Sequence, residues 1–333
     1  MLDGVFLAGM AVLLACRPDD PVGDPSRRHA GELDELYAVV GGLQDSVLLH
    51  PRFPRVGDRG LVLYDQGRNA IEAFDRAGQL LWVFGKRGRG PGEFLRVTDL
   101  RLHQSGSIWI LDLDNARLTI LSPAGSYLRS LPIPRDAGLA DRFYFLDARR
   151  IVLLAHRDPI AAVMDTSGQL LGFRQHPWPE ARNHHPMALA FKPLLDPDDD
   201  RLVLMQYYGA GLLATDRGLQ TPARLIPYVE PIPIPDVHVA RSASRTVATI
   251  QTRTLAAVDG VRDGDDVYIL FGGLTDGSRR FVDHYDLETG RYLDTWLLPS
   301  PARYIAVAGD TLFSVHMDPL PRLQAWRLRR DPG

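Results

Sequence analysis

The sequence predicts an all-β fold, a six-bladed β-propeller built from four-stranded antiparallel blades. Short apolar runs of five or six residues alternate with turn signals from about residue 36 to the end, and no long amphipathic helix interrupts them. A unit of three strands recurs six times along the chain. Such units are apolar on both faces, so they must stack around an axis to bury both.

The first unit, at residues 60–85, follows the order strand, loop, strand, tight turn, strand. Five further units occupy residues 107–131, 150–173, 201–226, 266–298 and 311–328. The fifth unit has a longer central loop, and the sixth lacks its last strand. Glycine recurs at the tight turns, where its tolerance of positive φ suits a hairpin, at Gly78, Gly125, Gly168 and Gly218.

Weaker apolar runs between the units are expected to supply the first strand of each blade. They lie at residues 97–102, 143–146, 187–191, 255–258 and 304–307. Residues 45–50, near the N-terminus, are expected to form the missing outer strand of the sixth blade. That pairing of the two chain ends closes the ring and removes exposed sheet edges. A loop-rich insertion at residues 231–254 predicts a lid or a hairpin.

An apolar run at residues 5–15 is too short to span a bilayer, which takes about 20 residues, but it has the length of a signal-peptide core. It ends at Ala15-Cys16, which resembles the lipobox of bacterial lipoproteins. The resemblance implies a signal peptide at 1–15 and a lipidated Cys16. Residues 16–35 are polar and read as a flexible tether, which leaves a single propeller at 36–330. We therefore expect an exported protein anchored by lipid to the bacterial cell envelope.

Composition limits the partners. The formal net charge of −3 gives no broad attraction for nucleic acid or anionic lipid, so nucleic acid is not an expected partner and the membrane is contacted through the lipid anchor only. Cys16 is the sole cysteine, so no intramolecular disulfide forms.

Two motifs resemble those of bacterial six-bladed propellers related to NHL repeats. The first is a glycine-rich connector between blades, read here at Gly85, Gly88, Gly90, Pro91, Gly92, Glu93 and Phe94. The second follows it at Asp112, Asn115, Arg117 and Leu118, with a weaker copy at Asp65, Arg68, Asn69 and Ile71. The resemblance implies the propeller fold and a binding or interaction role, with some hydrolase or lyase relatives. It supports the fold more strongly than any function.

Propeller topology brings the loops between second and third strands to the same end of the ring as the connectors between blades. A concave face at that end is a reasonable ligand site. The candidate binding face comprises Asp65, Asn69, Arg87, Arg89, Asp112, Asp114, Asn115, His156, Asp158, His184, His185, Tyr207, Tyr208, His316 and Asp318. For any single aspartate, the alternative is that it only caps a turn. Arg87 and Arg89 lie in a segment where Pro91 argues against the helix that a phosphate-binding loop would precede.

We predict a binding or scaffold module whose ligand is a protein, a peptide or a small molecule that the sequence does not name. The alternative is a metal-dependent hydrolase or lyase, similar to lactonase propellers, with its site at the central face. His156 and His316 occupy equivalent positions in opposite blades, and Asp112 and Asn115 are possible calcium ligands, but zinc needs roughly three or four ligands. The chain has no HExxH or G-x-S-x-G motif. We therefore assign no catalytic residue, metal site or cofactor, with calcium or zinc tied to the alternative.

Overall fold

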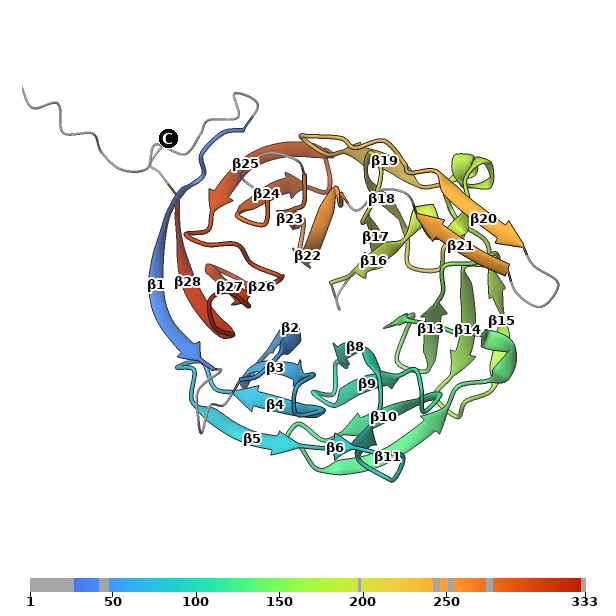
Figure 1. Ribbon diagram of the computed structural model, residues 1–333, viewed down its shortest axis with the longest axis horizontal. Helices are drawn as coiled ribbons and strands as arrows, with labels where there is room; N and C mark the ends of the chain where they lie inside the picture. The colour runs from blue at the N-terminus through green and yellow to red at the C-terminus, as the bar shows by residue number, and fades with distance from the viewer. Residues whose placement is uncertain are drawn as a thin grey trace, which may run out of the picture.

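The structure is a computed structural model that describes residues 27–41, 48–196, 199–241, 246–250, 254–273 and 278–330. Across these residues, six four-stranded antiparallel sheets stand around a central axis, so the predicted six-bladed propeller is confirmed (Figure 1). The part of the chain that is described contains no helix long and apolar enough to cross a membrane. The predicted signal peptide and Cys16 lie outside the described residues.

Each blade has its first strand innermost and its fourth strand at the rim (Figure 1). Blade one holds β2 (Pro51–Gly57), β3 (Gly60–Asp65), β4 (Ala70–Phe74) and β5 (Leu80–Phe84). Blade two holds β8 (Val97–Leu102), β9 (Ile108–Asp112), β10 (Arg117–Leu121) and β11 (Tyr127–Pro132). Blade three holds β12 (Arg142–Phe145), β13 (Arg150–Leu154), β14 (Ala161–Asp165) and β15 (Leu170–Arg174).

The second half of the chain repeats this order. Blade four holds β16 (Phe191–Leu194), β17 (Arg201–Gln206), β18 (Gly211–Asp216) and β19 (Arg224–Pro227). Blade five holds β22 (Ala257–Asp263), β23 (Asp266–Phe271), β24 (Phe281–Asp286) and β25 (Arg291–Leu297). Blade six holds β26 (Tyr304–Ala308), β27 (Thr311–His316), β28 (Arg322–Arg330) and β1 (Gly31–Val40).

The ring is closed by an N-terminal strand, as predicted, but that strand is β1 rather than residues 45–50. It pairs with β28 from Gly31↔Arg330 to Val40↔Arg322. Residues 48–50 form no strand, and 45–47 lie outside the described residues. The propeller thus begins within the segment expected to be a tether. The acidic residues of β1 point away from the core, and they make the strand difficult to recognise in the sequence. Leu33, Tyr37 and Val39 pack against the clusters of blade six and its neighbours.

Arg27, just before β1, is also fixed to the ring. Its guanidinium donates to both carboxylate oxygens of Asp283 in β24, at 2.9 and 3.0 Å, and lies 4.1 Å from the centre of the Phe271 ring. A guanidinium that forms two hydrogen bonds with one carboxylate and packs on an aromatic ring is held in one position. Residues 27–30 of the predicted tether therefore contact blade five, and residues 31–35 belong to β1 in blade six.

Two of the expected first strands are displaced. Residues 187–191 do not form a strand, because Pro186–Leu189 is a 3-10 helix (η3) and β16 begins only at Phe191. Pro186 suits the first turn of that helix, and the ring of His185 accepts the N–H of Met187 at its start. The fifth first strand starts at Ala257 rather than 255. The insertion at 231–254 contains a hairpin, β20 (Val237–Arg241) paired with β21 (Thr246–Ile250).

Four further short elements lie in the connections. They are the 3-10 helices η1 (Arg135–Ala137) and η2 (Pro179–Asn183), and a parallel pair of β6 (Lys86–Arg87) with β7 (Glu93–Phe94).

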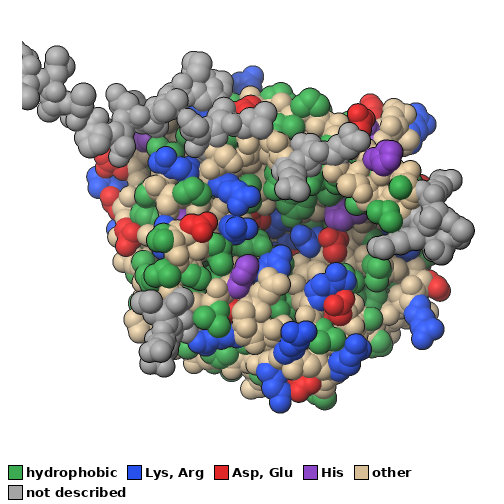
Figure 2. Space-filling model, in the orientation of Figure 1, with side chains coloured by type: hydrophobic (Ala, Val, Ile, Leu, Met, Phe, Trp, Pro, Cys, Tyr) green, Lys and Arg blue, Asp and Glu red, His purple; other side chains and the backbone are tan. Residues whose placement is uncertain are grey.

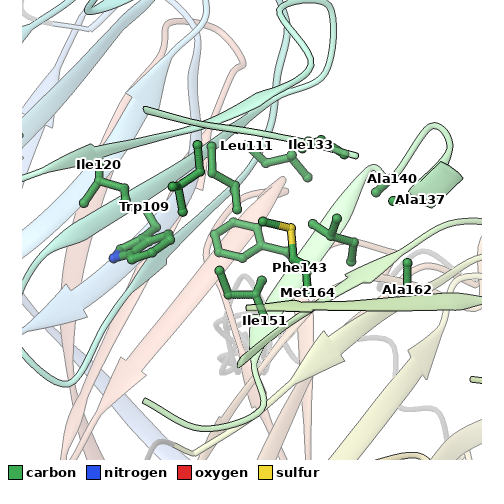
Figure 3. Close-up of a cluster of buried hydrophobic side chains, with 13 residues drawn as sticks. Trp109, Leu111, Ile120, Ile133, Ala137, Ala140, Phe143, Ile151, Ala162 and Met164 are labelled. Carbon is green, nitrogen blue, oxygen red and sulfur yellow. The ribbon is translucent and has the colours of Figure 1, made fainter. Parts of the chain in front are cut away.

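The core lies between blades rather than within one central body. Figure 3 shows one such cluster, in which Trp109 and Leu111 of blade two meet Phe143, Ile151 and Met164 of blade three. Because both faces of a blade pack against a neighbour, its middle strands are apolar at consecutive positions. This explains why runs such as Ile108–Asp112 are buried throughout.

Candidate functional site

The inner strands of all six blades surround a cavity of about 240 Å³ that opens toward the connectors between blades. Figure 2 looks onto one end of the ring, where Lys and Arg side chains gather around a central hollow. We call this cavity the central funnel. Its lining comprises Arg52, Phe53, Arg55, Asp99, Arg142, Lys192, Tyr207, Leu255, Val258, Asp259, Arg279, Arg303 and Tyr304.

β-Bulges in three inner strands orient charged side chains toward the funnel. The register shifts between Arg52 and Arg55 in β2, before Asp99 in β8, and before Asp259 in β22. In β2 the shift is accompanied by a left-handed backbone at Phe53, with φ 55°. A bulky residue in this region is uncommon, and bulges and strained residues concentrate near binding sites.

A layer of buried ion pairs crosses the funnel with the same pattern in each half of the ring. In blades one to three, Arg55 Nη2 lies 3.1 Å from Asp99 Oδ1, and Asp99 accepts the N–H of Phe143 at 3.2 Å. In blades four to six, Lys192 donates to Asp259, which accepts the N–H of Ile305 at 2.9 Å. Each carboxylate therefore joins the inner strand of its own blade to that of the next.

Burial and charge act in opposite directions on this layer. Burial lowers the pKa of Lys192 to about 8, although its pairing with Asp259 opposes the shift. Burial alone would raise the pKa of Asp99, but the charges of Arg101, Arg55 and Arg142 together hold it below its usual value. Asp99 thus stays ionised at neutral pH.

Polar contacts continue from this layer to the loops of blade three. Arg142 donates to the phenol oxygen of Tyr207 at 3.2 Å and lies 3.5 Å from Asp141. His156 Nε2 lies 3.1 Å from the same carboxylate. Burial acts to raise the pKa of Asp141, but His156 and Arg142 bring it below its usual value. This chain of contacts places His156 beside the funnel wall without lining it.

Of the fifteen residues predicted for the binding face, Tyr207 alone appears in the funnel lining. Asp65 and Asp112 are fully buried and occupy equivalent positions at the ends of β3 and β9. Asp65 accepts the N–H groups of Leu49 and His50, and Asp112 accepts those of Leu95 and Arg96. Their role in the structure is to cap the segments that enter blades one and two.

Three more of the predicted residues serve the same two loops. Asn115 donates to Asp112 at 2.6 Å and to the carbonyl of Gly88 at 3.0 Å. Asn69 has φ 54° and accepts the hydroxyl of Tyr64 at 3.1 Å. Asp114 forms a surface ion pair of 2.8 Å with Arg96. All three hold local turns, and none lines the funnel.

Arg87 and Arg89 are exposed on the glycine-rich connector, away from the funnel lining. Arg117 donates to the carbonyls of Arg89, Gly90 and Glu93, at 3.1, 2.7 and 2.7 Å. The connector is therefore a compact turn tied to blade two, with the β6–β7 pair in place of a helix.

The predicted histidines do not meet. His316 is fully buried among Ser300, Ser314 and the carbonyl of Pro301, and burial lowers its pKa to about 4. His184 stacks on Trp178 with ring centres 5.8 Å apart, and His185 caps η3. Within the residues described, no group of three or more His, Cys, Asp or Glu side chains is placed to hold a metal ion.

The last three members of the predicted face lie outside the funnel lining. Asp158 and Asp318 are exposed, and each precedes a cis-proline in the loop between the second and third strands of its blade. Tyr208 is partly buried beside Tyr207.

Sequence reasoning missed the charged residues of the inner strands. They are Arg52, Arg55, Asp99, Arg142, Lys192 and Asp259, with Arg303 just before β26. For Asp99, Lys192 and Asp259 a signal exists, because each interrupts a short apolar run, and a strand buried on both faces would carry no charge there. The first strands of a propeller face its axis, so a charge repeated there marks the funnel.

A second cavity of about 310 Å³ lies at the opposite end of the ring. Its wall is more apolar, with Val56, Leu102, Val261 and Val307 from four inner strands or the turns that follow them. Arg55 and Lys192 line both cavities. The ion-pair layer therefore lies between the two.

Comparison of the sequence with protein-family models and with curated proteins gave no match. Solved structures match its fold. Virginiamycin B lyase from Staphylococcus aureus has a TM-score of 0.56 at 11% identity, covering 90% of this chain and 100% of the lyase. A member of the DUF4221 family from Bacteroides vulgatus has a TM-score of 0.55 at 11% identity, covering 92% and 100%. A protein of inferred export from Bacteroides fragilis has a TM-score of 0.54 at 11% identity, covering 90% and 95%. At such identity the likeness shows the fold alone.

Proposed function

We propose that this protein is an exported binding or scaffold propeller that takes its ligand in the central funnel and is held at the bacterial envelope by a lipid on Cys16. The observation that carries the proposal is the funnel itself, a charged cavity lined by inner strands of every blade. Concave sites with a few convergent polar groups are the usual places for small ligands in such folds. The likeness to a protein of inferred export from Bacteroides fragilis agrees with the envelope location.

Binding accounts for the geometry better than hydrolysis. The charged groups of the buried ion-pair layer pair with one another, as in Arg55–Asp99 and Lys192–Asp259. These contacts make the wall of the funnel rigid. A metal-dependent hydrolase or lyase would need converging ligands, and the predicted His156 and His316 belong to separate blades with separate partners. We therefore do not propose a metal-dependent hydrolase or lyase as the function.

The exposed members of the predicted face form an outer rim in this proposal. Arg87, Arg89, Asp158 and Asp318 lie on the connectors and loops at the same end as the funnel. A peptide or protein that entered the funnel would contact this rim, whereas a small molecule would not.

Native mass spectrometry of the protein purified from its host envelope tests the binding role. We expect a bound species that is retained by Arg59→Gln, at the opposite end of the ring, and lost by Phe53→Ala in the funnel wall. Equal retention by both variants, or an unliganded wild type, would count against a funnel site.

Fractionation tests the anchor separately. Cys16→Ser should move the protein from the membrane to the soluble fraction or block its processing. An unchanged distribution together with an uncut N-terminus would refute the lipid anchor.

A further inference from the structure

The funnel carries more positive charge than its carboxylates can neutralise. Six cationic side chains and two carboxylates line it. Three of the cations are engaged, since Arg55 pairs with Asp99, Lys192 with Asp259, and Arg142 with Asp141 outside the lining. The other three are Arg52, Arg279 and Arg303.

Arg52 is oriented by neutral partners only. Its Nε donates to the hydroxyl of Tyr304 at 2.9 Å, and its Nη1 donates to Gln66 Oε1 at 3.0 Å. The guanidinium lies 4.7 Å from the centre of the Phe53 ring, the residue with the left-handed backbone. These contacts hold the guanidinium in one orientation, and none of them neutralises its positive charge.

Arg279 and Arg303 are brought together by the backbone. The N–H of Ala302, the residue before Arg303, donates to the carbonyl of Arg279 at 2.7 Å. The N–H groups of Arg279 and Arg303 are in turn bonded to Phe271 and Val315, each at 2.7 Å. Arg279 adopts φ 63°, a conformation that costs free energy and that the surrounding hydrogen bonds maintain.

Neither guanidinium has a carboxylate partner in the part of the chain that the structure describes. Both arginines line the funnel together with Arg52, and like charges that share one cavity repel each other. The neighbouring His50 responds to this field. Burial first lowers its pKa, and the charges of Arg52 and Arg303 lower it further.

We propose that the central funnel binds an oxyanion group of its ligand, a carboxylate or a phosphate, between Arg279, Arg303 and Arg52. This inference rests on the proposed binding function and names the chemistry of the ligand. The planar guanidinium fork matches the oxygens of both groups in paired hydrogen bonds, and an anion there removes the repulsion. A cavity of about 240 Å³ has room for the anionic end of a small molecule.

Titration calorimetry and thermal melting with inorganic phosphate and with citrate test the inference, at an ionic strength held constant with chloride. At least one of the two anions should bind and raise the melting temperature above the chloride control. Arg279→Gln/Arg303→Gln should weaken that binding by about 100-fold or more, because each hydrogen bond to a charged group contributes about a factor of ten. Arg279→Lys/Arg303→Lys, which keeps the charge and loses the fork, should lie between.

The matched control is Arg182→Gln, an exposed arginine on the connector that contains η2, at the same end of the ring and outside the funnel. It should bind the anion as the wild type does. A response to phosphate alone would identify a phosphoryl ligand, and a response to citrate alone would identify a carboxylate. Both results support the inference.

The inference is overturned if neither anion exceeds the chloride control, or if Arg182→Gln loses as much affinity as the double glutamine variant. Melting curves of the variants without anion establish that each is folded. If the protein from its host still carries a funnel-bound species by native mass spectrometry while ignoring both anions, the proposed function stands and the oxyanion site fails.

Discussion

Glu72, in the middle of β4, offers a sharp test of how burial governs the stability of this ring. Its side chain is fully buried, and one carboxylate oxygen lies 3.5 Å from Arg68 Nη1. The other oxygen has no hydrogen-bond partner among the residues described. Burial, assisted by the charge of Asp65 and opposed by Arg68, raises the pKa of Glu72 from 4.5 to about 8.

The sign of the pH dependence follows from this direction. A carboxyl with a raised pKa in the folded state keeps its proton at neutral pH, whereas the unfolded chain releases it. The contribution of Glu72 to the free energy of unfolding is therefore most favourable below pH 4.5 and falls as the pH rises toward 8. Above pH 8 this contribution no longer changes with pH. The full shift corresponds to a limit of about 3 kcal/mol lost at pH 7. Because Arg68 is one-third exposed and admits water, we expect about 1–2 kcal/mol.

Glu72→Gln removes the titration and keeps the shape of the side chain. Its melting temperature relative to wild type should rise by about 2–5 °C between pH 5 and pH 8, since 1 kcal/mol shifts a domain of this size by about 2–3 °C. Circular dichroism at the two pH values measures the difference. Glu288→Gln, at an exposed glutamate, should show no such rise. If the difference between Glu72→Gln and wild type is the same at both pH values, the carboxyl titrates normally and the reasoning is refuted.

Three other predictions concern the layers of the fold. Lys192→Met should destabilise the protein by about 3–5 kcal/mol, because it leaves the buried Asp259 without its cation, and a melting temperature within about 2 °C of wild type would contradict this. Phe143→Ala should cost about 3–5 kcal/mol by opening a cavity between blades two and three, measured by chemical denaturation, and a loss below about 1 kcal/mol would mean that the site collapses. Asp112→Ala should free two backbone N–H groups at the start of β8 and speed proteolytic cleavage of the preceding connector, whereas cleavage at the wild-type rate would show that the cap is dispensable.

The fold was readable because propeller blades are buried on both faces. The run at residues 108–111 is apolar at successive positions, and the recurrence of such runs in six units indicated the ring. β1 escaped because it is an outer strand with one buried face. Its acidic residues resemble those of a tether, while Leu33, Tyr37 and Val39 pack against the neighbouring clusters.

The candidate site was less accessible for a different reason. Asp65 and Asp112 were predicted on a ligand face and prove to cap the chain, because a turn aspartate looks the same in both roles. The funnel depends on contacts between distant residues, such as Lys192 with Asp259, 67 positions apart. No local pattern reports such a pairing. Only the inner position of the strands shows that their charges converge.

The pairing of β1 with β28 also constrains the order in which the strands can assemble while the protein is being made. Gly31 pairs with Arg330, so the first strand to leave the ribosome is among the last to find its place. Until nearly the whole chain has emerged, or has crossed a membrane, β1 stays without its partner and blade six presents an open edge that other chains can join. A chain that stops before Arg322 lacks β28 altogether, so the ring cannot shut and the damage from a late truncation reaches the first residues of the domain.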